Sequence, residues 1–206
     1  MFSVLIAEDQ AMPRQLFSSF AQNAEGFTLA KAVASGEDAV NFCKNNRVDL
    51  AILDVVLGSG MNGLEAARQI KSFSPKTKVI IVTSMAEVNY IKTAREIGVE
   101  SFWYKEIQEQ PIIAVMEKTM NGESVYPDTA PVLKIGNAKS TDFTPRELEI
   151  LREMTTGATN KEIAEKFSVT VDAVKLHISN MLQKTGYKNR VELAVKARAD
   201  GLVIGE

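Results

Sequence analysis

The sequence predicts an α/β domain with a (βα)5 doubly wound parallel sheet, followed by a small all-α domain. Three observations favour this fold class. Over residues 1–122, short β-branched runs alternate with amphipathic stretches, which is the pattern of βαβ units. Over residues 123–142 this periodicity stops, and proline, glycine and small polar residues indicate a linker. Over residues 143–206 the strand pattern is absent and helix-capping signals follow one another.

Each predicted strand of the first domain is a short run of apolar and β-branched residues. The five strands are Ser3–Ala7, Thr28–Val33, Asp49–Leu53, Lys78–Val82 and Ser101–Tyr104. The five amphipathic helices that follow them are Met12–Gln22, Gly36–Asn45, Gly63–Ser72, Val88–Ile97 and Glu109–Asn121. Because parallel strands need crossover connections, we expect these helices to cover both faces of the sheet.

The second domain is predicted from four helix starts. Three of them carry a capping box, in which a polar N-cap residue is followed three residues later by Glu. The starts are Thr144 with Glu147, Thr159 with Glu162, Thr170 without a partner, and Asn189 with Glu192. These short spacings predict short helices joined by tight turns.

Composition favours a protein of the cytoplasm. The chain has 206 residues, of which 45% are hydrophobic and 24% are charged, and no apolar run reaches the roughly 18 residues that a membrane span needs. We therefore expect no membrane partner. The N-terminus lacks a basic region and a cleavage site, so no export is expected. The single cysteine, Cys43, is interpreted as a packed thiol, which fits a reducing compartment.

The charge distribution is more informative than the net charge of −2, which argues against a protein that coats nucleic acid. Between Ala173 and Arg198 there are six basic residues and one acid, which gives a local charge of +5. The basic residues are Lys175, Lys184, Lys188, Arg190, Lys196 and Arg198.

Acidic and basic side chains follow the predicted strands of the first domain. Glu8 and Asp9 follow the first strand, Asp54 the third, Thr83 the fourth and Lys105 the fifth. Because ligand sites in such sheets form at the carboxyl ends of the strands, we expect these residues to meet. Three carboxylates in one place repel one another unless a cation is present, and Mg²⁺ prefers oxygen ligands of this kind.

An aspartate in such a site can act as a nucleophile toward phosphorus. A metal ion would neutralise the phosphoryl oxygens, Lys105 would supply a fixed positive charge, and the Thr83 hydroxyl could donate to the transferred group. Taken singly, Asp54 could equally cap the following loop and Lys105 could be an ordinary solvated residue.

With these residues at these strand ends, residues 1–122 resemble the receiver domain of two-component response regulators, which has a flavodoxin-like fold. The resemblance implies phosphotransfer from a sensor histidine kinase to Asp54. It implies Mg²⁺ held by Asp9, Asp54 and the backbone carbonyl of Val56, with Glu8 acting through water. It also implies that Phe102 is an aromatic switch, although an aromatic residue near a strand end is commonly part of the core.

The loop after Asp54 departs from the pattern of that family. Residues Leu57–Gly63 lack the usual proline and are one residue longer, so their geometry and their effect on the site stay open. This loop supports an alternative, a DNA-binding protein whose receiver works without phosphate. A third alternative is an aspartyl phosphatase of the haloacid dehalogenase kind. It is disfavoured because Val56 stands where that family has its general acid, so we expect a regulator and not an enzyme.

The third helix of the second domain predicts a DNA reader. One face carries Val171, Val174, Ile178, Met181 and Leu182, and commits this side to the core. The opposite face carries Asp172, Leu176, Ser179, Asn180 and Gln183, with Lys175, His177 and Lys184 at its edges. Polar groups at the centre with cations at the rims suit the major groove, although a solvated helix can show the same pattern.

Residues 143–201 resemble the LuxR-type helix-turn-helix, through Asn160–Ala164, Ala173–Asn180 and Lys184. Together with the receiver this gives the NarL/FixJ architecture. The resemblance implies promoter DNA as a partner, with RNA polymerase as a further candidate partner. The implied DNA-binding residues are Asn160, Thr170, Lys175, Leu176, Ser179, Asn180 and Lys184. Ala173 replaces a common threonine, which would remove one hydroxyl contact to phosphate. His177 is interpreted as a residue that contacts the DNA backbone or makes a local structural bond.

The active protein is expected to be a homodimer. By resemblance, the last helix, from Asn189 to Asp200, can pair with its equivalent in a second chain. It can equally close the core of its own domain, so whether dimerisation uses this helix or the receiver stays open.

Overall fold

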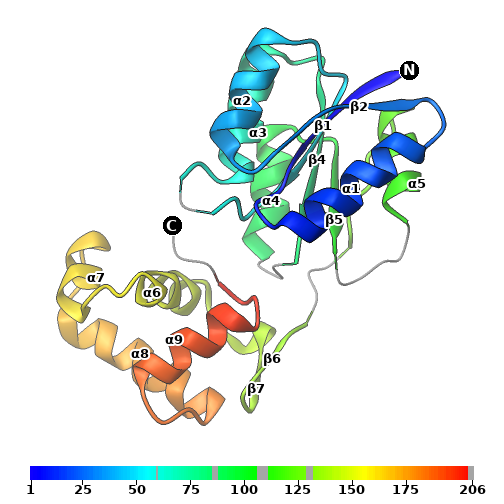
Figure 1. The fold of residues 1–206 in the computed structure, drawn as a ribbon. Coiled ribbons are helices and arrows are strands. Elements are labelled where there is room, and N and C mark those ends of the chain that lie inside the picture. The colour runs from blue at the N-terminus through cyan, green and yellow to red at the C-terminus, as the bar shows by residue number, and fades with distance from the viewer. Residues whose placement is uncertain (59, 85–87, 106–110, 129–131, 204–206) are drawn as a thin grey trace. The chain divides into compact units, whose positions relative to one another are not determined.

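The computed structural model describes residues 1–58, 60–84, 88–105, 111–128 and 132–203. These residues form two compact units, coloured from blue to green and from green to red in Figure 1. The first unit holds the described residues up to 128 and the second holds those from 132 onward. Each unit has its own hydrophobic core.

Strands and helices alternate throughout the described part of the first unit. The elements are β1 (Phe2–Ala7), α1 (Ala11–Asn23), β2 (Phe27–Val33), α2 (Gly36–Asn45), β3 (Leu50–Asp54), α3 (Gly63–Phe73), β4 (Lys78–Thr83), α4 (Val88–Ile97), β5 (Ser101–Tyr104) and α5 (Ile112–Met120). The strands lie in the order β2-β1-β3-β4-β5, and every neighbouring pair is parallel. The doubly wound fold is therefore confirmed.

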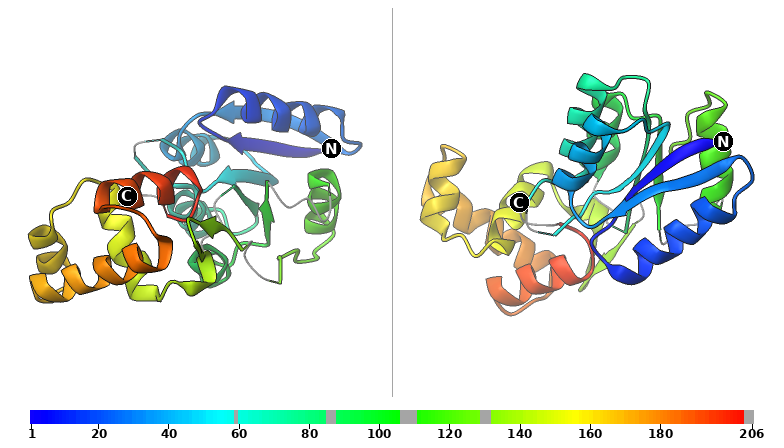
Figure 2. Two further views of the ribbon diagram at one scale, coloured as in Figure 1. Left: turned by 90° about the horizontal axis from the view of Figure 1, so that it is seen from below. Right: turned by 45° about the horizontal axis from the view of Figure 1, so that its top comes forward.

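Helices cover both faces of this sheet (Figure 2). On one face, Val4 and Ile6 of β1 belong to a core cluster with Phe17 of α1 and Val115 of α5. Helices α2, α3 and α4 pack beside one another in sequence. Since all five strands run in the same direction, their carboxyl ends meet at one edge of the sheet, where the predicted site residues stand.

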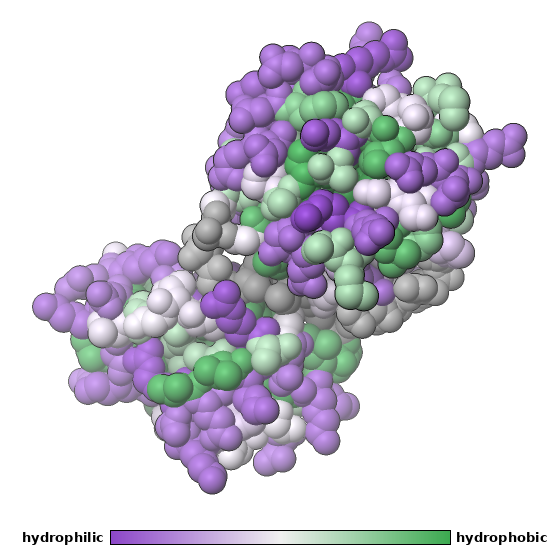
Figure 3. Space-filling model, in the orientation of Figure 1, coloured by the Kyte–Doolittle hydropathy of each residue, from purple (hydrophilic) through white to green (hydrophobic). Residues whose placement is uncertain are grey.

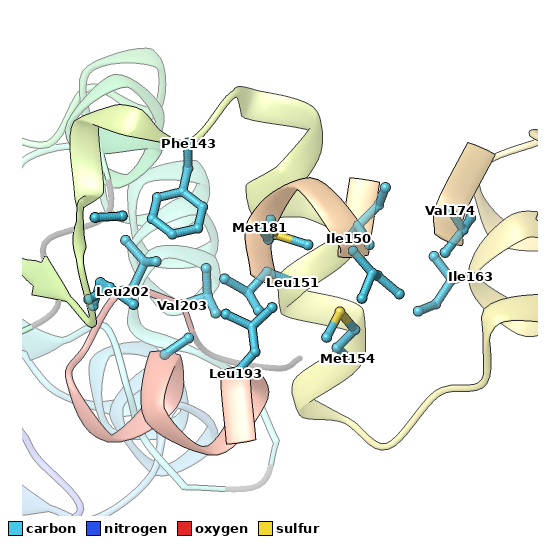
Figure 4. Packing of buried hydrophobic residues seen from close by; sticks show 14 of the residues in the cluster. Phe143, Ile150, Leu151, Met154, Ile163, Val174, Met181, Leu193, Leu202 and Val203 are labelled. Carbon is cyan, nitrogen blue, oxygen red and sulfur yellow. The ribbon is translucent and has the colours of Figure 1, made fainter. Parts of the chain in front are cut away.

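The second unit is built from a short hairpin and four helices within the described residues. Its elements are β6 (Lys134–Ile135), β7 (Ala138–Lys139), the 3-10 helix η1 (Ser140–Asp142), α6 (Pro145–Thr155), α7 (Asn160–Lys166), α8 (Val171–Thr185) and α9 (Arg190–Ala199). Leu151 of α6, Met181 of α8 and Leu193 of α9 are fully buried and converge in the core (Figure 4).

The predicted helix starts are confirmed. The side chains of Thr144, Thr159, Thr170 and Asn189 each accept a hydrogen bond from a backbone amide of the first turn. One detail was wrong, because Glu192 does not complete a capping box with Asn189. Its carboxylate accepts from the amide of Lys188, 2.9 Å away.

The predicted linker, residues 123–142, contains structure that its composition does not indicate. The side chains of Ile135 and Ala138, one on each strand of the β6–β7 hairpin, are buried in the core of the second unit. Gly136 turns the hairpin at a φ of +60°, and a Cβ there would lie 2.2 Å from the carbonyl oxygen of Thr185. Strands of two residues are too short to show a period of two, so no sequence pattern marks them.

The other elements begin and end within one or two residues of their predicted bounds. The exception is α5, which begins at Ile112 in the described residues. Its predicted start, Glu109, lies outside them. None of the helices formed by the described residues combines the length and the apolar character needed to cross a membrane.

Candidate functional site

The carboxyl ends of β1, β3 and β5 bring acidic side chains and a lysine together. Lys105 Nζ lies 2.6 Å from Glu8 Oε2 and 2.6 Å from Asp54 Oδ2. The Glu8 side chain is fully buried, and those of Asp54 and Lys105 are only 5% and 15% exposed. An ion pair so little exposed is screened far less than one at the surface. Sequence-predicted residues from three strands thus meet in one buried cluster.

Burial also shifts the pKa of Asp54. It raises the pKa of Asp54 to about 7, against the opposing charge of Lys105 and with a further increase from Glu8. For Lys105, burial lowers the pKa, but Asp54 and Glu8 outweigh it and leave the pKa raised. Asp54 Oδ1 accepts a hydrogen bond from the amide of Val56 at 3.3 Å. The carboxylate would therefore be stabilised by a further cation.

The acidic cluster fits a divalent metal ion. Oxygen atoms of Glu8, Asp9 and Asp54 lie within 4.8 Å of one another. Asp9 Oδ1 is buried and has no hydrogen-bond partner among the described residues. Because an unpartnered buried oxygen is costly, a hard cation with oxygen ligands is the natural partner for this set of side chains. The backbone carbonyl of Val56 as a further ligand stays a prediction.

Arg14 was not among the predicted site residues. Its Nη1 donates to the carbonyl oxygens of Glu8 at 2.7 Å and Asp9 at 3.0 Å. These bonds hold the peptide groups that carry both acidic side chains and add positive charge beside them. A single arginine in an amphipathic helix carries no pattern that distinguishes this contact from an exposed position.

The described residues of the loop after β3, which leave out Ser59, pack closely against their neighbours. A Cβ at Gly63 would lie 1.8 Å from the carbonyl oxygen of Asp54, so only glycine fits there. The Met61 amide donates to Glu37 Oε1 at 2.8 Å, and a Cβ at Gly36 would lie 2.5 Å from the Met61 carbonyl oxygen. The unusual loop is therefore attached to the start of α2.

Thr83 and Phe102 lie on the two neighbouring strands beside this cluster. Thr83, the last residue of β4, is fully buried, and its carbonyl oxygen accepts from the Lys105 amide at 2.9 Å. Phe102 of β5 is 1% exposed. It contacts two tyrosines that were not among the predicted site residues. Its ring centroid lies 5.1 Å from that of Tyr104 and 6.3 Å from that of Tyr126. The switch role of Phe102 stays a prediction.

Helix α8 presents the predicted reading face to the surface of the second unit. Val174, Ile178 and Met181 are buried, as their spacing predicts. On the other side, Lys175 and Ser179 are exposed, and Leu176 is 61% exposed. Asn180 is half-buried. Leu176 is thus the apolar side chain at the centre of this exposed polar face.

Two of the other predicted DNA-binding residues, Thr170 and Asn160, also have structural roles. Thr170 Oγ1 caps α8 by accepting from the Ala173 amide at 3.1 Å. Asn160 Oδ1 accepts from Arg190 Nη1 at 2.6 Å, and Arg190 also donates to the Ala158 carbonyl oxygen at 2.7 Å. These bonds join the start of α7 to the start of α9.

Lys184 is held inside the second unit. Its Nζ donates to Glu147 Oε2 at 2.6 Å, to Glu147 Oε1 at 2.8 Å and to the Asp142 carbonyl oxygen at 2.9 Å. Burial favours a raised pKa for Glu147, but the bonds from Lys184 and from the Thr144 amide outweigh it and lower the pKa. The ammonium group of Lys184 therefore ties the end of α8 to the start of α6.

The surface around Lys184 is concave. A hollow of about 440 Å³ is lined by Thr144, Glu147, His177, Asn180, Gln183 and Lys184.

Elsewhere on the second unit, an apolar band runs over α9 among hydrophilic side chains (Figure 3). Val191 and Val195, one turn apart on this helix, are 66% and 60% exposed. An exposed apolar pair of this kind suits contact with another protein surface.

Comparison with protein families assigns both units. Residues 4–117 match the response regulator receiver domain, and residues 141–197 match the bacterial regulatory proteins of the luxR family. The transcriptional regulatory protein DesR of Bacillus subtilis is 31% identical over 202 residues, which cover 98% of each chain. The response regulator protein VraR of Staphylococcus epidermidis is 31% identical over 205 residues, covering 97% of this chain and 98% of that one.

Solved structures share the fold. A structure of two RcsB dimers bound to two parallel DNAs matches with a TM-score of 0.60 and 16% identity, over 96% of this chain and 98% of that chain. A DNA-binding response regulator of the LuxR family from Staphylococcus aureus matches with a TM-score of 0.55 and 29% identity. This second match covers 59% of this chain and 100% of that chain.

Proposed function

This chain belongs to the response regulators that join a receiver domain to a LuxR-type DNA-binding domain, and we propose that a phosphoryl group on Asp54 controls its binding to promoter DNA. The observation that carries the proposal is the pairing of Asp54 with Lys105 at 2.6 Å beside Glu8 and Asp9. A nucleophilic carboxylate, a fixed ammonium group and an acidic cluster suited to Mg²⁺ are the components that phosphoryl transfer needs.

In the proposed transfer, one carboxylate oxygen of Asp54 attacks the phosphorus of a phosphohistidine on a sensor kinase. An O–P bond forms as the P–N bond breaks, and the leaving imidazole takes up a proton from water. When bound, Mg²⁺ neutralises charge on the phosphoryl oxygens. Asp9 and Asp54, with the Val56 carbonyl, would hold the metal, and Glu8 would act through water. Lys105 would move its bond from Asp54 to a phosphoryl oxygen.

The signal would leave the site through Thr83 and Phe102. A phosphoryl group adds about −1.5 to −2 charges, and the Thr83 hydroxyl would donate to it. The movement of Thr83 would open space for the Phe102 ring on the neighbouring strand. The surface formed by α4 and β5 would then change, and this change would bias dimerisation and the release of the DNA-binding domain.

In the DNA-binding domain, we assign sequence reading to α8. Leu176, Ser179 and Asn180 would enter the major groove, with Leu176 suited to a thymine methyl group. Lys175 and the cap of α8 at Thr170 would contact phosphate. Asn160 and Lys184 would act partly by holding the fold, because both already bond to other residues of the domain.

The concave region beside α8 suits a DNA phosphate. It is formed by the capped start of α6 and by polar side chains of α8 that include His177 and Lys184. Because the start of α6 is closed by its capping box and the Glu147 carboxylate is paired with Lys184, a phosphate would be bound mainly by His177, Asn180 and Gln183 of α8. His177 would then contact the sugar-phosphate backbone of the DNA, which agrees with its position at the edge of the reading face.

The partners follow from this mechanism. They are a sensor histidine kinase, promoter DNA, RNA polymerase, and a second copy of the chain in a homodimer. The exposed pair of Val191 and Val195 on α9 would contribute to the dimer. Phosphorylation, dimerisation and DNA binding would all take place in the cytoplasm.

The assignment of Asp54 is tested by phosphorylating the full-length protein with radiolabelled acetyl phosphate and Mg²⁺. We expect acid-stable, base-labile labelling of the wild-type protein and none of Asp54→Asn. Asp38→Asn is the matched control, because Asp38 is an exposed carboxylate of the same unit, and it should be labelled like the wild type. Labelling of Asp54→Asn equal to that of the control would exclude Asp54 as the phosphoacceptor.

A further inference from the structure

The residues that follow α5 run back along β5, an edge strand of the sheet. The Phe102 amide donates to the Val125 carbonyl oxygen at 2.8 Å. The Val125 amide in turn donates to Ser101 Oγ at 3.1 Å. These bonds attach the first residues of the predicted linker to the strand that ends directly before Lys105.

Tyr126 extends this attachment. Its ring stacks on Phe102, with centroids 6.3 Å apart and planes inclined by 28°. Its hydroxyl donates to the Val99 carbonyl oxygen at 2.7 Å, and the Arg95 guanidinium lies 4.0 Å from the ring centroid. Tyr126 thus contacts α4, the turn after it and β5 at once, which are the elements expected to change on phosphorylation.

On its other side, Phe102 contacts the residue next to the phosphoacceptor site. The rings of Phe102 and Tyr104 meet edge to face at 5.1 Å, and Lys105, which pairs with Asp54, follows Tyr104 directly. The Tyr104 hydroxyl is buried and has no hydrogen-bond partner among the described residues. Such a group gains stability from any rearrangement that supplies an acceptor.

We propose that Val125 and Tyr126 form a linker anchor, a contact that holds the start of the linker on β5 until phosphorylation displaces Phe102. The proposal rests on the proposed function of Asp54 and extends it toward the DNA-binding domain. Displacement of the Phe102 ring removes the stacking partner of Tyr126, so that the backbone bond between the Phe102 amide and Val125 must hold the linker without it and breaks more readily. The linker then gains length, and the DNA-binding domain gains freedom to pair with a second copy on DNA.

The anchor is tested first by hydrogen exchange of single amides in the full chain, with and without acetyl phosphate and Mg²⁺. We expect exchange of the Phe102 amide to rise at least about tenfold on phosphorylation, because its acceptor is lost. The Ile52 amide in the central strand β3 should not change. Unchanged Phe102 exchange in protein that carries the phosphoryl group would overturn the anchor and leave the proposed function standing. If no phosphoryl group enters the protein, both proposals fail.

Variants test the anchor without phosphate. Tyr126→Ala should raise the DNA affinity of the unphosphorylated protein at least about tenfold, toward that of the phosphorylated wild type, because the linker is already released. Tyr126→Phe keeps the ring but loses the bond to Val99, so it should give a smaller rise and guards against a folding defect in the alanine variant. Glu123→Ala, an exposed position of the same segment, should leave affinity unchanged. Wild-type affinity in both folded Tyr126 variants would contradict the anchor.

Discussion

Gly63 packs against the backbone of Asp54 so closely that a Cβ atom at Gly63 would lie 1.8 Å from the Asp54 carbonyl oxygen. The Gly63 amide also donates to the Val55 carbonyl oxygen at 3.0 Å. The start of α3 therefore supports the strand end that carries Asp54, the proposed phosphoacceptor. This contact fixes the Asp54 backbone at the base of the loop that follows it.

Gly63→Ala should destabilise the first unit by more than about 2 kcal/mol, because backbone atoms must separate to admit the methyl group. Gly26→Ala is the control. A Cβ at Gly26 meets nothing within 4 Å, so the expected cost there is only the roughly 1–2 kcal/mol of the left-handed backbone. Urea unfolding followed by the fluorescence of Trp103 measures both. An equal or smaller cost at Gly63 would contradict the close contact.

The lowered pKa of Glu147 predicts a stability of the second unit that depends on pH. Its folded pKa lies below the unfolded value of about 4.3. The contribution is therefore fully present above that value and is lost as pH falls through the folded pKa. Glu147→Gln should cost about 2 kcal/mol at neutral pH, because the hydrogen bonds from Lys184 and the Thr144 amide then no longer meet a charged carboxylate. The cost should vanish in acid.

Glu149→Gln on the same helix is the control for this prediction. Its ion pair with Arg146 joins residues three positions apart, about one turn of α6, and the Glu149 side chain is 42% exposed, so the change should cost less than about 0.5 kcal/mol. Far-UV circular dichroism during urea unfolding follows both variants. A cost for Glu147→Gln that does not depend on pH would show that Lys184 does not hold the carboxylate.

Asp9→Asn should weaken Mg²⁺ binding by at least about tenfold, because it removes a charged ligand from the acidic cluster. Trp103, the single tryptophan, lies two residues before Lys105 and provides a fluorescence signal for the titration. Asp38→Asn should bind Mg²⁺ like the wild type. Equal affinity in Asp9→Asn and the wild type would place the metal elsewhere.

Lys175 and Leu176 should differ in how they affect DNA binding, although they are neighbours on α8. Lys175→Ala should weaken binding to all sequences and lower the salt-dependence slope by about one, as loss of a phosphate contact does. Leu176→Ala should leave the slope unchanged and relax sequence preference at one base pair. Anisotropy titrations at several salt concentrations distinguish the two. The same change of slope in both variants would contradict these assignments.

Part of this site follows from sequence, because the topology of a parallel sheet determines it. Once strands are placed before Glu8, Asp54 and Lys105, their meeting at one edge is required. Side-chain contacts between distant residues are different. Lys184 bonds to Glu147, 37 residues away, and no local periodicity shows that a basic residue at the rim of the predicted reading face of α8 turns inward.

The linker shows the same limit. Ile135 and Ala138 lie in a segment whose proline, glycine and polar content indicates a linker, yet they complete a core. Tyr126 stacks on Phe102 only because the chain folds back along β5. Composition reports the average character of a segment, whereas these contacts depend on single side chains that the fold brings together.

In the proposed mechanism, a phosphoryl group on Asp54 controls DNA binding. This control is tested by the affinity of the protein for the duplex that it selects from a random pool, measured with and without acetyl phosphate and Mg²⁺. We predict that phosphorylation raises the affinity at least about tenfold and that acetyl phosphate has no effect on Asp54→Asn. Equal affinity of the phosphorylated wild type, the unphosphorylated wild type and Asp54→Asn would contradict the claim and favour a receiver that works without phosphate.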